Sequence, residues 1–215
     1  MKKEVADIRE DYTLKTLSET EAAPTPVAQF DKWWKDAVAA KLTEVNAMTL
    51  ATVDTDGTPA ARIMLLKDYG ERGFCFYTNY DSHKGQQLLQ NPKACLVFFW
   101  KELQRQVRVT GTVEKLSEEE SKKYFFSRPV PSQIGALVSH QSEVIPNRPF
   151  LEEKKHAIET AVTGGEAIQK PDYWGGFLVK PTVVEFWQGG AGRLHDRLQY
   201  TLQADGQWLI ERLSP

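Results

Sequence analysis

Basic side chains recur in this sequence beside hydroxyl and amide side chains, a combination that is suited to binding phosphate. A phosphate group carries about −1.5 to −2 charges at pH 7, and Arg forks, Lys ammonium groups and helix N-terminal amides all bind it. Taken singly, each such cation is also typical of an ordinary solvated surface. Together they indicate a site for a phosphorylated small molecule. The positions are Arg62 and Lys67 at the two ends of RIMLLK, His83 and Lys84 at an expected helix start, Arg128 near Ser132, and Arg193 with Arg197.

A glycine-rich loop, 189–192, delivers the last of these groups. It follows a strand pattern but leads into RLHDR (193–197) and a further strand pattern, whereas the dinucleotide-binding fingerprint opens a helix. In an extended backbone alternate residues share one face, which would bring Arg193, His195 and Arg197 together. A lone His in such a loop is commonly only solvated, but two arginines on its face favour a binding or catalytic role.

Several other functions lack support in the sequence, which contains no HExxH, GxSxG or GxxxxGK[ST] motif. The net charge of −2 argues against a general nucleic-acid binder. Cys75 and Cys95 lie in separate apolar runs without a CxxC motif, which predicts buried thiols in a reducing compartment. The opening MKKEVADIRED lacks the apolar stretch of a signal peptide, and no transmembrane run follows. We therefore expect a cytoplasmic protein with no metal and no nucleic-acid or membrane partner.

The elements that must position these side chains are helices and short strands in alternation. The polar first 25 residues predict a mobile N-terminal arm over 1–25, followed by a single domain over 26–215. A first helix should begin at Pro26 after the N-cap Thr25 and bury one apolar stripe. The further expected helices are 83–90 after the N-cap Ser82, 118–127 after the capping box Ser117–Glu120, 132–138 and 150–163.

Apolar runs bounded by turn residues predict the strands. Asp56-Gly57 and Asp205-Gly206 favour hairpins, because Gly accepts the positive φ that such turns need. Hairpin order with intervening helices predicts an α+β protein built on an antiparallel β-barrel with peripheral helices. The expected strands are 48–53, 59–66, 74–79, 94–100, 106–116, 174–179, 182–188, 198–202 and 208–212, with a polar break at 68–73.

Five blocks occur in a distinctive order: RIMLLK (62–67), FYTNYDSHKG (76–85), RQV (105–107), YFFSRPVPSQIGALVSHQS (124–142) and FWQGGAGRLHDR (186–197). With these blocks, the chain resembles the pyridoxine (pyridoxamine) 5′-phosphate oxidase family over essentially its full length. The resemblance implies an antiparallel split β-barrel that binds FMN. It also implies a homodimer with two flavin sites at the subunit interface, each built from both chains.

The resemblance carries the family's flavin contacts onto this chain by matching position. Arg62 and Lys84 are the expected partners of the flavin phosphate. The family often has an Arg where this chain has His83, and an imidazole of pKa about 6.5 is only partly charged at neutral pH, which predicts weaker or more pH-dependent flavin binding. The implied FMN-binding residues are Arg62, Ile63, Met64, Leu65, Leu66, Lys67, Tyr77, Thr78, His83, Lys84, Gln106, Gln141, Ser142, Trp187 and Arg197.

The same matching implies a substrate site for a phosphorylated B6 vitamer. A Lys charge, an Arg fork and two hydroxyls would bind its phosphate, and the RLHDR loop would lie against its pyridine ring. Arg193 and His195 are the expected catalytic residues, and the N-terminal segment around Tyr12 is an expected lid. The implied substrate-binding residues are Arg9, Glu10, Asp11, Tyr12, Lys67, Tyr124, Arg128, Ser132, Arg193, Leu194 and His195.

The implied reaction converts pyridoxine or pyridoxamine 5′-phosphate to pyridoxal 5′-phosphate by hydride transfer to FMN, with oxygen as acceptor and hydrogen peroxide as product. His195 or Asp196 could remove the substrate proton, or no base is needed. Two other hypotheses stay open. One is a related split-barrel oxidase or reductase with a different aromatic substrate, and the other is a carrier that binds flavin or pyridoxal phosphate without turnover.

Overall fold

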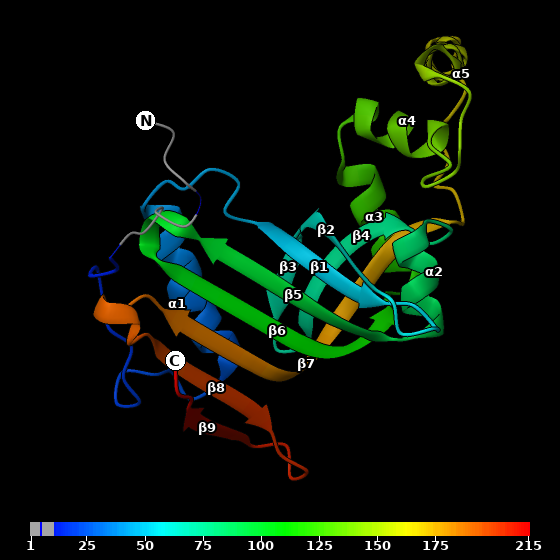
Figure 1. The fold of residues 1–215 in the computed structure, drawn as a ribbon. Coiled ribbons are helices and arrows are strands. Elements are labelled where there is room, and N and C mark those ends of the chain that lie inside the picture. Colours follow the sequence, from blue (N-terminus) through cyan, green and yellow to red (C-terminus); the bar gives the residue numbers. More distant parts are fainter. Residues whose placement is uncertain (1–4, 6–10) are drawn as a thin grey trace.

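The computed structural model describes Val5 and residues 11–215, which form one antiparallel sheet with helices around it (Figure 1). The strand order is β2-β1-β5-β6-β7-β4-β3, with β8 paired to β7 and β9 paired to β8. This confirms the predicted α+β class. The strands are β1 (Ala47–Val53), β2 (Pro59–Leu65), β3 (Asp68–Gly70), β4 (Gly73–Asn79), β5 (Lys93–Trp100), β6 (Arg105–Lys115), β7 (Trp174–Gln188), β8 (Asp196–Leu202) and β9 (Trp208–Arg212). The helices are α1 (Pro26–Ala39), α2 (His83–Gln90), α3 (Glu118–Ser127), α4 (Val130–Val138) and α5 (Arg148–Thr163).

Strand β7 organises the sheet, because it is one continuous strand where the sequence predicted two. Its first part pairs with β4, its second part pairs with β8, and β6 pairs with it from Phe177 to Gln188. The register between β6 and β7 shifts at Thr110/Gly111, opposite Pro181. A Cβ on Gly111 would lie 2.0 Å from the Lys180 carbonyl oxygen, so glycine permits this close approach. The bulge therefore accommodates a proline that the sequence pattern suggested would end the strand.

Helix α1 covers the core face of the sheet with the predicted stripe. Thr25 caps it by accepting a hydrogen bond from the Ala28 amide. Phe30, fully buried, meets five aromatic rings, of which Phe74 and Phe98 come from β4 and β5. Val38 lies at helical spacing from these apolar residues, which predicts that it belongs to the stripe, but it is half exposed at the helix end. The burial and packing of these aromatic rings stabilise the core.

Two further helices, α2 and α3, start at their predicted capping residues. Ser82 caps α2, and Ser117 and Glu120 form the full capping box of α3. The structure differs at three places: α4 begins at Val130, α5 begins at Arg148 after the N-cap Asn147, and the expected polar break contains the short strand β3. These differences concern element ends and a three-residue edge strand, where propensity is the weakest guide.

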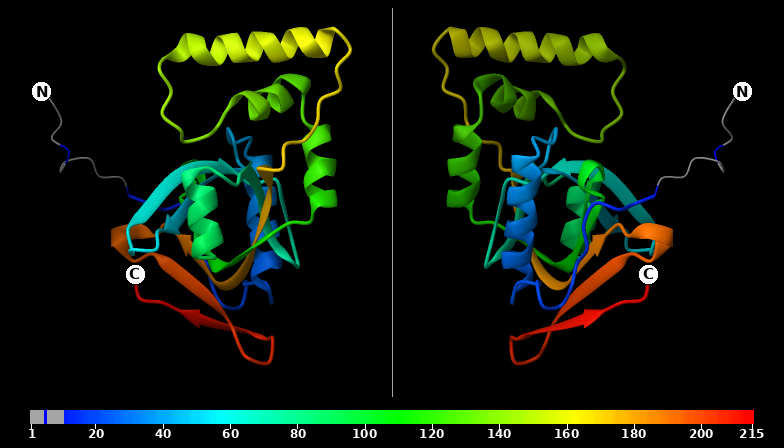
Figure 2. Two further views of the ribbon diagram at one scale, coloured as in Figure 1. Left: turned by 90° about the vertical axis from the view of Figure 1, so that its right-hand side faces the viewer. Right: turned by 90° about the vertical axis from the view of Figure 1, so that its left-hand side faces the viewer.

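The two ends of the molecule differ in structure. Helices α3, α4 and α5 gather at one end, and the β8–β9 hairpin lies at the other (Figures 1 and 2). Residues 11–25 lie against the body, and Leu17 is buried in the main core. The mobility predicted for the arm 1–25 stays a prediction. Both cysteines are free, as predicted, with Cys75 buried and Cys95 partly so. No helix in the described part of the chain is long and apolar enough to span a bilayer.

Candidate active site

A cavity of about 630 Å³ opens between the end of β2, strand β4 and helices α3 and α4. Its size falls within the range of about 300–1,000 Å³ that is typical of small-molecule sites. It brings together ten of the residues that the resemblance implicated. These are Ile63, Met64, Leu65, Lys67, Tyr77, Thr78, Tyr124, Arg128, Ser132 and Gln141.

Arg128 at the C-terminus of α3 has an unsatisfied donor beside this cavity. Its Nη1 is buried and has no hydrogen-bond partner within residues 11–215. The guanidinium lies over the Trp174 ring, 4.7 Å from the ring centroid, and burial lowers the pKa of Arg128 from its ordinary value. A buried donor without a partner costs free energy, which an anion in the cavity would recover. Lys67, Tyr124 and Ser132 line the same cavity and add an ammonium and two hydroxyls.

A stack of aromatic rings forms the wall behind Arg128. Tyr77 and Tyr124 stack with centroids 3.9 Å apart, and Tyr77 stacks on Trp174 at 5.5 Å. Burial raises the pKa of Tyr77 to about 12, so its hydroxyl stays neutral. The buried Lys170 positions Trp174 by donating to its carbonyl oxygen at 2.8 Å, and it pairs with Glu118 at the start of α3. These contacts join α3 to β7 and hold the wall in place.

Two cations, Arg62 on β2 and Lys84 on α2, lie close together near the cavity. Arg62 donates to Thr52 Oγ1 at 2.6 Å, and Lys84 donates to Thr78 Oγ1 and Gln141 Oε1. Neither cation pairs with a carboxylate in the described part of the chain. Burial, with the nearby charge of Arg62, lowers the pKa of Lys84 to about 8. Two uncompensated cations at a helix N-terminus fit a phosphate group.

The neighbouring loop completes this basic cluster. The His83 amide donates to Ser142 Oγ at 3.3 Å, which joins the start of α2 to the loop after α4. Leu66 does not line the cavity. Its side chain is buried in the core, and its backbone N–H and C=O both bond to Asn46. Because the Leu66 carbonyl keeps a second lone pair, its predicted flavin contact stays a prediction.

The remaining predicted residues lie at the other end of the sheet. Gln106, Trp187 and Arg197 are direct neighbours across β6, β7 and β8. Arg197 is bound to Glu185 through two hydrogen bonds of 2.9 and 3.1 Å, so its guanidinium is already paired within the chain. Tyr12 packs against Trp187 at this end and Asp11 precedes it, whereas Arg9 and Glu10 lie outside the described residues.

The RLHDR loop is not extended, which corrects the expectation that its alternate residues share a face. Residues Ala191–Arg193 form a 3₁₀ turn, and Arg193 has a left-handed φ of 64°. Arg193 and Leu194 are exposed. His195 turns inward, where its Nδ1 accepts a hydrogen bond from the Gly190 amide at 3.1 Å and its ring lies 4.7 Å from Trp187. The glycines permit the turn, so spacing alone could not reveal this geometry.

A single chain does not bring the whole predicted site together. Gln106, Trp187 and residues 193–197 do not line the cavity. The RLHDR loop lies at the far end of the sheet from α3 and α4 (Figure 1). Sequence reasoning also missed several wall residues, among them Trp174 and Asn79. Trp174 is recognised as a wall residue by its cation–π contact with Arg128, and this contact depends on tertiary packing that the sequence pattern does not reveal.

Comparisons with known proteins agree with this division of the chain. Residues 34–160 match the family model of pyridoxamine 5′-phosphate oxidase, and residues 174–215 match the pyridoxine 5′-phosphate oxidase C-terminal dimerisation region. Pyridoxine/pyridoxamine 5′-phosphate oxidase of a Nostoc species is 54% identical over 215 residues, all of both chains. The enzyme of the same name from Cupriavidus necator is 52% identical over 212 residues, 99% of each chain.

Solved structures show the same fold. PhzG from Burkholderia lata, in complex with tetrahydrophenazine-1-carboxylic acid, superposes with a TM-score of 0.87 at 28% identity and covers 94% of this chain and 99% of its own. A pyridoxamine 5′-phosphate oxidase-related, FMN-binding protein from Nostoc punctiforme gives a TM-score of 0.68 at 17% identity, covering 90% of this chain and 100% of its own. From the family models and the full-length relatives together, it follows that the chain belongs to the pyridoxine/pyridoxamine 5′-phosphate oxidase family.

Proposed function

We propose that the protein is an FMN-dependent oxidase that converts pyridoxine 5′-phosphate and pyridoxamine 5′-phosphate to pyridoxal 5′-phosphate, with oxygen as acceptor and hydrogen peroxide as product. The observation that carries this proposal is the buried, unpartnered Nη1 of Arg128 beside a cavity that Lys67, Tyr124 and Ser132 also line. An aromatic wall next to this group suits a flat phosphorylated ring. The full-length relatives carry the name of this activity.

The basic cluster of Arg62 and Lys84 fits the phosphate of FMN, because it offers two uncompensated cations and the N-terminus of α2. Residues 63–65 and 77–78 face the same cavity and would lie along the flavin ring. When bound, FMN supplies the acceptor for the hydride that leaves the vitamer. The work of the protein is to place the two molecules in contact and to exclude water.

In this proposal the vitamer phosphate is bound by Lys67, Arg128 and the hydroxyls of Tyr124 and Ser132. An Arg fork fixes the orientation of a phosphate better than a point charge does. The aromatic wall shields one side of the cavity from solvent. Held in this way, the vitamer presents its C4′ carbon to the flavin in a fixed geometry.

Arg193 and His195 act from the far side of the vitamer ring, where the guanidinium orients the ring and stabilises charge that develops during hydride transfer. The Nδ1 of His195 accepts from the Gly190 amide, so the neutral imidazole carries its proton on Nε2 and offers the vitamer a hydrogen-bond donor rather than a proton acceptor. The carboxylate oxygens of Asp196 each accept one hydrogen bond, Oδ1 from Arg212 and Oδ2 from the Leu17 amide.

We also propose that the enzyme is a homodimer with FMN at the interface, so that each site joins the cavity of one chain to the RLHDR loop of its partner. The outward face of the sheet supports this proposal, because Ile63 and Phe99 are 67% and 55% exposed. Exposed apolar side chains on a sheet face mark an interaction surface. The match to a C-terminal dimerisation region over 174–215 is a second, independent support.

The direct test is to load the protein with FMN, add pyridoxine 5′-phosphate without oxygen, and follow the visible flavin absorbance. We expect bleaching, then recovery on admitting air together with formation of pyridoxal 5′-phosphate. Arg193→Leu should retain flavin but bleach about 100-fold more slowly, because a transition-state contact is lost. A bound flavin that stays oxidised with both vitamers would refute the proposal. Bleaching by another aromatic substrate alone would favour a related oxidase instead.

Flavin affinity should decrease as the pH rises above about 8, the pKa of Lys84 in the free protein. Protonated Lys84 is the binding form, so its contribution is complete below that pH. Above that pH, the Kd for FMN should rise by up to about tenfold per pH unit, until the pH reaches the higher pKa that Lys84 has in the complex. FMN fluorescence quenching between pH 7 and 10 measures the effect. Lys84→Arg, which keeps its charge, should flatten the curve; a slope equal to that of the wild type would contradict the assignment.

A further inference from the structure

The described N-terminal segment lies across the loop before β8 and is attached there at several points. Tyr12 packs edge-on against Trp187 with centroids 5.7 Å apart and lies 6.0 Å from the His195 ring. The amides of Thr13 and Leu14 both donate to Gln104 Oε1, at 3.0 and 3.2 Å. The segment therefore lies directly against the loop to which the proposed function assigns Arg193 and His195.

The backbone beneath Tyr12 is shaped for this contact. A Cβ built on Gly189 would lie 2.7 Å from the Tyr12 Cβ, which is closer than real side chains approach. Gly189 also donates its amide to the Gln104 carbonyl at 2.8 Å, which fixes it to the turn that holds Thr13 and Leu14. Because glycine has no Cβ, Tyr12 can pack directly on the backbone of Gly189, beside Trp187.

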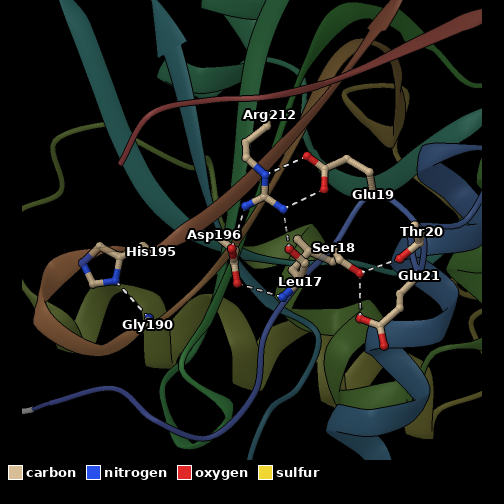
Figure 3. Close-up of polar contacts among 9 residues, drawn as sticks. All are labelled: Leu17, Ser18, Glu19, Thr20, Glu21, Gly190, His195, Asp196 and Arg212. Carbon is tan, nitrogen blue, oxygen red and sulfur yellow. Dashed lines mark hydrogen bonds and ion pairs between the residues drawn. The ribbon is translucent and has the colours of Figure 1, made fainter.

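A group of charges, Arg212, Glu19 and Asp196, fastens the other end of the segment (Figure 3). The guanidinium of Arg212 forms a fork with Glu19, at 2.7 and 2.9 Å, and donates to Asp196 Oδ1 at 2.6 Å. It also donates to the Leu17 carbonyl at 2.9 Å, while Asp196 Oδ2 accepts from the Leu17 amide at 2.9 Å. Both backbone groups of Leu17 are therefore fixed by residues of β8 and β9.

The position of Asp196 gives this arrangement its significance. Asp196 follows His195 directly and is the first residue of β8. Its carboxylate accepts from the Leu17 amide, so it fixes the position of the N-terminal segment relative to the loop that carries His195. The hydrogen bond from Arg212 holds the pKa of Glu19 at about 2, which keeps the fork charged across the working pH range. Leu17 itself is buried in the core, so the anchor point is rigid.

We propose that Arg212 and Asp196 are positioning residues that clamp the N-terminal segment onto the RLHDR loop and so place Tyr12 against Trp187 and His195. This inference rests on the proposed function for its link to catalysis. Asp196 acts here as an anchor rather than as a proton acceptor, because each of its oxygens accepts a hydrogen bond from the clamped groups, Oδ1 from Arg212 and Oδ2 from the Leu17 amide. Arg212 reaches the reacting groups only through Asp196 and Leu17.

The test compares Arg212→Met and Asp196→Asn with the wild-type holoenzyme in steady-state kinetics. Both variants should raise KM for pyridoxine 5′-phosphate by about tenfold, because each removes a charge-assisted network, while kcat changes less than about threefold. A general base would behave differently: Asp196→Asn alone would then lower kcat by about 100-fold or more. Arg212→Lys should restore only part of the loss, since an ammonium cannot form the fork. Arg148→Met, which breaks an exposed Arg148–Glu152 pair on α5, is the matched control and should leave KM unchanged.

A second readout does not depend on turnover. Trypsin cleavage after Lys15, followed by mass spectrometry of the native holoenzyme, should be about fivefold faster in Arg212→Met, because the segment opens locally while the body stays folded. Glu19→Gln, which keeps Arg212 and Asp196 in place, should show a smaller increase. Wild-type cleavage rates in both variants would overturn the clamp, whether or not the oxidase activity is found.

A double-mutant cycle with Tyr12→Ala separates positioning from general destabilisation. If the clamp acts by placing Tyr12, Arg212→Met should add less than about twofold to KM once Tyr12 is already Ala. Additive effects on KM would refute the link between Arg212 and Tyr12.

Discussion

Co-expressing two impaired variants, Arg128→Met and Arg193→Leu, should restore turnover at low vitamer concentration that neither variant reaches alone. Arg128 lies beside the cavity near α3 and α4, whereas Arg193 lies on the loop at the opposite end of the same chain. In the proposed dimer each site takes Arg128 from one chain and Arg193 from its partner. A mixed dimer therefore contains one site with both substitutions and one site with neither.

The expected amount follows from counting the dimers. Random assortment makes half of the dimers mixed, each with one intact site of two, so co-expressed variants should reach about a quarter of wild-type turnover. The check is turnover per flavin for the mixture at a vitamer concentration near the wild-type KM, where the raised KM of Arg128→Met suppresses its own turnover, with each variant assayed alone and mixed only after purification as controls. If one chain formed a complete site by itself, both proteins in every mixture would be defective and no activity would return.

Arg128→Met should raise KM for the vitamer phosphates by about 100- to 1,000-fold, because a charge-assisted Arg contact with phosphate contributes about 1.5–3 kcal/mol per hydrogen bond. Flavin content should be unchanged, since Arg62 and Lys84 form a separate cluster. The substitution removes a buried Nη1 that has no partner in residues 11–215, so the free energy of unfolding of the free protein should change by less than about 1 kcal/mol.

Steady-state kinetics with both vitamers and urea unfolding of the protein measure these two effects. Arg128→Lys should lie between the wild type and Arg128→Met, because an ammonium supplies charge without a fork. Arg148→Met, on the exposed face of α5, is the control for removing an arginine. A normal KM in Arg128→Met would place the substrate phosphate elsewhere and remove the main support for the proposed function.

Much of the fold could be predicted from local sequence signals. Thr25, Ser82 and Ser117 cap their helices as expected, because side-chain capping depends on residues only three positions away. The hairpin turn at Gly57 and the one at Gly206 adopt the positive φ that the Asp-Gly pairs predicted. Strand β7 was divided wrongly, because the bulge that tolerates Pro181 depends on Gly111, a residue far away in sequence.

The sequence by itself determined which side chains are available for chemistry: two sets of cations, the aromatic residues between them and the motif around His195, in an order that carries the family resemblance. Only the tertiary structure decided how they are distributed. It placed Arg62, Lys84 and Arg128 at one end of the sheet and the RLHDR loop at the other, and it fastened that loop to the N-terminal segment through Arg212. The physical reason is that burial and long-range pairing depend on which strands become neighbours. Strand β7 starts at Trp174 beside the cavity and ends at Gln188 before the RLHDR loop, so its length places the cavity and the loop at opposite ends of the sheet.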